Sequence, residues 1–111
     1  MTKEDLHKIV KQFVYATIMT FKEYRGIKNE ELVNEIIQSA TRMSAQCREA
    51  CENQDVEKAK TELHGCSDFL SEVLYLMNLL EHSRTIDEIN VENIVLEGID
   101  LKQKIDSVCK K

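Results

Sequence analysis

The chain has 111 residues, of which 42% are apolar, 32% charged and 5% aromatic, and its formal net charge is −5. This length suits one domain with a single core, and no apolar run approaches the roughly 20 residues that a membrane-spanning helix needs. The opening Met1–Asp5 lacks the basic and then apolar order of a signal peptide, so we expect a cytoplasmic protein, no membrane, and four reduced cysteines.

The sequence contains no proline, which leaves long helices unbroken. The first helix is expected over residues 3–24, because apolar residues recur there at helical spacing. Thr2, followed by Asp5 three residues later, resembles a capping box. Gly26 suits the C-terminal end, since glycine enters the left-handed region at little cost. Besides its main stripe, this helix carries a second apolar line made of Val14, Ile18 and Phe21.

The next two helices are expected over residues 30–52 and 56–82. Asn29 is a suitable N-cap for the first of them, and the second starts near Asp55. The stripe of residues 30–52 consists of Val33, Ile36, Ala40, Met43, Cys47 and Ala50. The heptad seam of residues 56–82 consists of Val56, Ala59, Leu63, Cys66, Leu70, Val73, Met77 and Leu80.

A fourth helix is expected over residues 86–108. Thr85 with Glu88 would form a second capping box, and Asn90 is a rival start. Its stripe consists of Val91, Ile94, Gly98, Leu101, Ile105 and Val108. Gly98 costs about 1 kcal/mol of helix propensity relative to alanine, so it marks either a close approach between helices or a kink.

Short connections between the predicted helices make consecutive helices antiparallel neighbours. We therefore predict an all-α fold, an up-down-up-down antiparallel four-helix bundle that occupies residues 1–111 as one domain. The apolar faces of the first and third helices are wider than one seam requires, and an apolar surplus of this kind marks interfaces. We expect a homo-oligomer, or a complex with a protein partner, with an interface drawn from Val14, Ile18, Phe21, Phe69, Leu76 and Leu79.

Cysteine and histidine side chains give a superficial zinc pattern, formed by Cys47, Cys51, His64 and Cys66. However, residues 64 and 66 lie about 200° apart around a helix and do not aim at one ion. The histidines are scattered, and no glycine-rich loop accompanies them. We therefore expect a protein that is not an enzyme, without catalytic residues, metal or cofactor.

The charges are unevenly distributed, with basic ends and an acidic middle. Residues 1–28 carry six basic and three acidic side chains, residues 29–100 carry five and sixteen, and residues 101–111 carry four and one. The first and fourth helices are neighbours in a closed bundle, so their cations could form one phosphate-binding surface. This alternative, nucleic-acid binding, would use Lys3, Lys8, Lys11, Lys22, Arg25, Lys28, Lys102 and Lys104.

Residues 35–50, EIIQSATRMSAQCREA, resemble the signature helix of the "four helix bundle protein" family. That family includes proteins encoded in ribosomal-RNA intervening sequences and the accessory variability protein of diversity-generating retroelements. The positions that match by type are Ile36, Ala40, Ala45 and Glu49. Residues 69–74 and 85–105 resemble the family's third and fourth helices. The resemblance implies an up-down bundle that forms a cyclic pentamer, and a basic surface that in the retroelement protein binds nucleic acid and reverse transcriptase.

Overall fold

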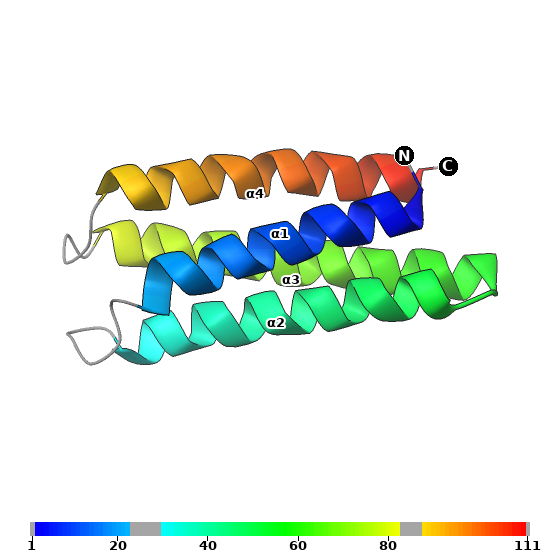
Figure 1. The fold of residues 1–111 in the computed structure, drawn as a ribbon, viewed down its shortest axis with the longest axis horizontal. Helices are drawn as coiled ribbons and strands as arrows, with labels where there is room; N and C mark the ends of the chain where they lie inside the picture. The colour runs from blue at the N-terminus through cyan, green and yellow to red at the C-terminus, as the bar shows by residue number, and fades with distance from the viewer. Residues whose placement is uncertain (1, 23–29, 83–87, 111) are drawn as a thin grey trace.

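The computed structural model describes residues 2–22, 30–82 and 88–110, and within them every regular element is a helix (Figure 1). The four helices are α1 (Lys3–Phe21), α2 (Glu30–Glu52), α3 (Val56–His82) and α4 (Glu88–Cys109). They run side by side along the 44 Å length of the molecule (Figure 1). The all-α four-helix fold predicted from the sequence is confirmed.

Each helix packs against two neighbours, so the four helices form a closed ring. Within the described residues α1 packs on α2 and α4, and α3 packs on the same two, whereas the backbones of α1 and α3 lie diagonally across the ring. Contact is most extensive between α2 and α3 and sparsest between α1 and α4. Successive helices alternate in direction (Figure 1), as expected for short connections.

Polar side chains fix two of the helix starts. At α1, Thr2 Oγ1 accepts from the Asp5 amide at 3.1 Å, and the Thr2 amide donates to Asp5 Oδ2 at 3.3 Å. This is the predicted capping box, with aspartate in the usual glutamate position. At α3, Asp55 Oδ1 accepts from the amides of Glu57 and Lys58, at 3.0 and 3.3 Å. Both caps satisfy amides that a helix leaves unpaired in its first turn.

The observed bounds of α2 and α3 are those predicted, and the other two helices differ slightly. The described part of α1 ends at Phe21 with Lys22 as its C-cap, short of the predicted residue 24. The described part of α4 runs from Glu88 to Cys109, one residue past the predicted end at 108, and the predicted start at 86 lies outside the described residues. Three further predicted signals, at Gly26, Asn29 and Thr85, lie outside the described residues.

The core lies between the four helices and contains nearly all of the predicted stripe positions. One position is wrong: Val56 was placed in the α3 seam but is 65% exposed. It is the first residue of α3, so it projects past the end of the packed core. The largest side chains that are almost completely buried include Phe21, Leu6, Ile36, Met43, Leu70, Met77, Leu80, Leu101, Ile105, Val10, Val33 and Val73.

Gly98 marks a close approach between helices, because α4 continues through it without a break. A Cβ atom at this position would lie 2.5 Å from Leu74 Cδ2 of α3 and 3.2 Å from Phe13 Cζ of α1. Side chains from two neighbouring helices therefore fill the space that the missing Cβ leaves. Of the two alternatives raised by the sequence, the structure shows the close approach.

Candidate functional site

The thiols of α2 and α3 are packed as small apolar groups. Cys47 and Cys66 are fully buried, and Cys66 Sγ donates to the Met43 carbonyl at 3.5 Å. The hydrogen bond with Cys66, together with burial, raises the pKa of the Cys47 thiol far above its usual value. Burial and the neighbouring Cys47 raise the pKa of Cys51 to about 11. These shifts disfavour the thiolate, which is the nucleophilic form.

The superficial zinc pattern does not converge in space. His64 is exposed, whereas Cys66, two residues further along α3, is buried in the core. This is the separation that the helical angle between residues 64 and 66 predicted. Within residues 2–22, 30–82 and 88–110, no three His, Cys, Asp or Glu side chains are grouped so that they could hold a metal ion.

The structure divides the six predicted interface residues between the core and the surface. Val14, Phe21 and Leu76 are at most 8% exposed and belong to the core of the chain itself, which corrects their assignment to an outer surface. The physical reason is that each helix has two neighbours in the ring, so a wide apolar face is covered within one copy. Ile18 and Phe69 pack partly against this core. Leu79 is exposed as predicted.

Other apolar side chains take the place of those three at the surface. Among the described residues, seven large apolar side chains are between 41% and 66% exposed: Tyr15, Met19, Val56, Tyr75, Leu79, Leu96 and Ile99. The sequence prediction missed Tyr75, Leu96 and Ile99 because it followed stripes and their extensions. The signal that could have found them is an apolar residue that interrupts the polar face of a helix.

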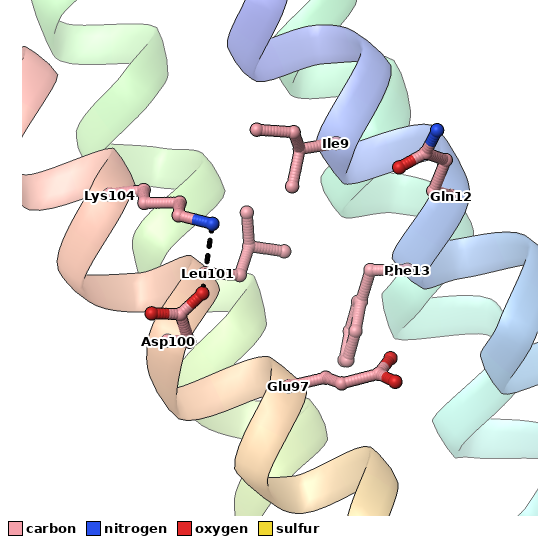
Figure 2. Close-up of a pocket in the computed structure, with 7 residues that line it drawn as sticks. All are labelled: Ile9, Gln12, Phe13, Glu97, Asp100, Leu101 and Lys104. Carbon is pink, nitrogen blue, oxygen red and sulfur yellow. Dashed lines mark ion pairs between the residues drawn. The ribbon is translucent and has the colours of Figure 1, made fainter. Parts of the chain in front are cut away.

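The sparsest helix pair, α1 and α4, leaves a surface groove of about 350 Å³ between its members (Figure 2). Ile9, Phe13 and Leu101 supply its apolar side chains. Its polar side chains are Gln12, Glu97, Asp100 and Lys104. Figure 2 shows Lys104 paired with Asp100, and their Nζ and Oδ2 atoms are 2.9 Å apart. These seven residues include no nucleophile paired with a base.

Three lysines of the predicted nucleic-acid surface have partners inside the chain. Lys3 Nζ donates to the carbonyls of Ala50 and Asn53, at 3.2 and 3.4 Å, and thereby caps the end of α2. Lys104 forms the ion pair in the groove. Lys102 Nζ donates to Ser67 Oγ at 2.7 Å and lies 4.0 Å from Asp106.

The other predicted cations lie on α1 or outside the described residues. Lys8, Lys11 and Lys22 are exposed on α1 and at its end. Lys8 and Lys11 line a hollow of about 380 Å³ together with Gln12 and Tyr15. Arg25 and Lys28 lie outside the described residues. Of the predicted cations within the described residues, Lys8, Lys11 and Lys22 are the exposed ones without an ion pair to another described residue, and they lie on α1 and at its end.

Compared with models of known families, with curated proteins and with solved structures, the chain matches none. The family resemblance of residues 35–50, and the pentamer that it implies, stay predictions. In the part of the chain that the structure describes, no helix has the length and apolar character required to cross a bilayer.

Proposed function

We propose that this chain is a non-enzymatic helical protein that acts by associating with further copies of itself or with a protein partner. The observation that carries the proposal is the set of seven exposed large apolar side chains. All seven lie on α1, α3 and α4, and three pairs, Tyr15 with Met19, Tyr75 with Leu79 and Leu96 with Ile99, are three or four residues apart on one helix. Exposed apolar groups that lie next to one another on a helix face are typical of interaction surfaces.

The energies of association favour a contact that uses several of these side chains at once. Complete burial of one large apolar side chain contributes about 1.5–3 kcal/mol. Association costs at least about 4 kcal/mol in lost translational and rotational freedom. One side chain therefore does not suffice, and an interface must bury several of these partly exposed side chains together. Because exposed pairs occur on three helices, we favour an assembly surface over single exposed apolar side chains that have no common role.

The test is the mass of the native protein in solution, measured by sedimentation equilibrium and light scattering over a wide concentration range. We expect a mass that rises with concentration to a multiple of 12.9 kDa. A mass of one chain at every concentration would contradict self-association and leave only the partner form of the proposal. The proposal also places the protein in the cytoplasm, a reducing compartment, because its four cysteines are free thiols.

A second candidate function, nucleic-acid binding, is supported by one feature of α1. Lys8 and Lys11 flank a hollow that Tyr15 also lines, and Tyr15 is the most exposed large apolar side chain of the described residues. Lysines that contact phosphates beside an aromatic ring that stacks on bases are typical of single-strand binding. Fluorescence anisotropy with a generic RNA oligomer tests this function. Binding that weakens steeply with salt, and that Lys8→Gln with Lys11→Gln reduces, is the expected result.

A further inference from the structure

We infer that the outer face of α1 in one copy docks on the outer face of α3 in a second copy, as a head-to-tail contact. The α1 face is defined by Lys8, Lys11, Tyr15 and Met19. The α3 face is defined by Asp68, Glu72, Tyr75 and Leu79. All eight side chains are exposed in the single chain. The inference rests on the proposed self-association and names the surfaces that carry it.

The two faces carry opposite charge. From Lys8 to Lys22 the chain has three lysines and no acidic residue. From Thr61 to His82 it has four acidic residues and no lysine or arginine. A second copy therefore offers each face a surface of the complementary sign. Complementary charge of this kind guides the encounter and selects the register of a contact.

The spacing of the residues also matches between the faces. Lys8, Tyr15 and Met19 are seven and four residues apart, and Asp68, Tyr75 and Leu79 have the same separations. At about 1.5 Å per residue, two parallel helices in this register bring lysine to aspartate and Tyr15 to Tyr75. The apolar tips of Met19 and Leu79 then meet. An antiparallel alignment would instead bring the lysines to Leu79 and the aspartate to Met19.

The fold allows every copy to use both faces at once. Among the described residues, the backbones of α1 and α3 lie diagonally across the ring, and α2 and α4 are the neighbours of both. Their outer faces therefore point away from one another. The two helices also run in the same direction along the bundle (Figure 1). A parallel contact thus keeps all copies in one orientation and leaves a complementary face open on each side.

Two variants test the contact by blocking one face each. The first carries Tyr15→Glu and Met19→Glu, and the second carries Tyr75→Glu and Leu79→Glu. We expect each variant alone to be monomeric at concentrations where the wild type assembles. An equimolar mixture should form a 1:1 dimer and nothing larger, because the intact α3 face of the first variant accepts the intact α1 face of the second. The two glutamates introduced into the α1 face cancel the charge of Lys8 and Lys11, and those introduced into the α3 face remove its apolar side chains, so neither blocked face has a partner.

The remaining outcomes separate this inference from the proposed function. A wild type that is monomeric at every concentration overturns this inference together with self-association, and leaves only the partner form of the proposed function. A wild type that assembles while either variant also assembles alone overturns the head-to-tail contact only, as would a mixture that stays monomeric. Val56→Glu with Leu96→Glu is the matched control, since it makes the same change outside both faces and should assemble normally. Circular dichroism checks that all variants are helical.

A charge swap tests the predicted register. Lys8→Glu alone should raise the dissociation constant of the assembly about tenfold, because attraction to Asp68 becomes repulsion. Adding Asp68→Lys in the same chain should restore the wild-type dissociation constant. The lysine and the carboxylate then exchange places at every contact, so opposite charges meet again. If the second change weakens assembly further, residues 8 and 68 do not meet and the register is wrong.

Discussion

Gly98 shows how a single missing side chain determines the distance between helices. Its backbone lies against Leu74 of α3 and Phe13 of α1. The other glycine of the described helices, Gly65, is less restricted, because a Cβ there would lie 3.2 Å from Nε2 at the flexible end of Gln46. Both glycines are inside helices, so both pay the same propensity cost relative to alanine.

Replacing each glycine with alanine measures the close approach at Gly98. Gly65→Ala should raise the free energy of unfolding by up to about 1 kcal/mol, through helix propensity alone. The free energy of unfolding of Gly98→Ala should be about 1–3 kcal/mol lower than that of Gly65→Ala, because Leu74 and Phe13 must shift to admit the new methyl group. Urea unfolding of both variants gives the difference. Equal effects at the two sites would contradict the close approach.

His7 makes stability depend on pH. Burial, with smaller effects of Lys11 and Arg48, lowers the pKa of this imidazole below its usual 6.5, while Glu52 opposes the shift. The unfolded chain therefore binds a proton more readily than the folded chain does. Stability should be full above pH 6.5 and should fall as the pH drops through the lower folded pKa.

Two histidine variants test this dependence. His7→Gln should flatten the part of the stability profile just below pH 6.5, as measured by urea unfolding across a pH series. His64→Gln is the matched control, because it makes the same substitution at a histidine that is exposed on α3. An unchanged slope in His7→Gln would mean that other groups cause the dependence.

At the scale of the helix, α3 depends most on its buried seam. Leu70 is fully buried near the middle of the helix. Leu70→Asp should abolish the cooperative melting transition, because an unpaired carboxylate would enter the core. Leu70→Ala, a milder change, should lower the free energy of unfolding by about 2–5 kcal/mol. Thermal melting followed by circular dichroism measures both, with Thr61→Asp on the exposed face of α3 as control. A normal transition in Leu70→Asp would mean that the seam is misplaced.

The helices could be predicted because the apolar spacing and the polar capping residues indicate the same segments of the chain. The bounds of α2 and α3 follow from apolar periodicity and polar caps, and the observed helices have those bounds. The link between α3 and α4 could not be predicted. Ser67 Oγ donates to Asp106 Oδ1 at 3.0 Å and accepts from Lys102. Such a pairing depends on the relative offset of two helices, which no local pattern contains.

At the scale of the whole molecule, the buried thiols report on opening of the bundle. Cys51 is partly exposed and should react first with an alkylating reagent, slowly because its pKa is about 11. Cys47 and Cys66 should react only when the chain unfolds, since both are fully buried. Mass spectrometry of labelled peptides, with increasing urea, follows each site. Labelling of Cys47 as fast as that of Cys51 without urea would contradict this packing.

The interface residues show where prediction from a sequence stops. Apolar spacing identifies side chains that leave water, and Val14, Phe21 and Leu76 do so. It does not say whether the covering atoms belong to the same chain or to another copy. That distinction depends on how the ring closes, and the ring covers these three residues while Leu79 stays exposed.

The helix α1 begins and α4 ends at the same end of the bundle, where the α2–α3 connection also lies (Figure 1). Lys3 of α1 and Val108 of α4 line one small hollow there together with Val56. A short glycine-rich linker could therefore join residues 2 and 110, and the chain could be cut instead between α2 and α3. Such a circular permutant would keep all four helix pairs. The same bundle should therefore form when the helices follow one another in a different order along the chain.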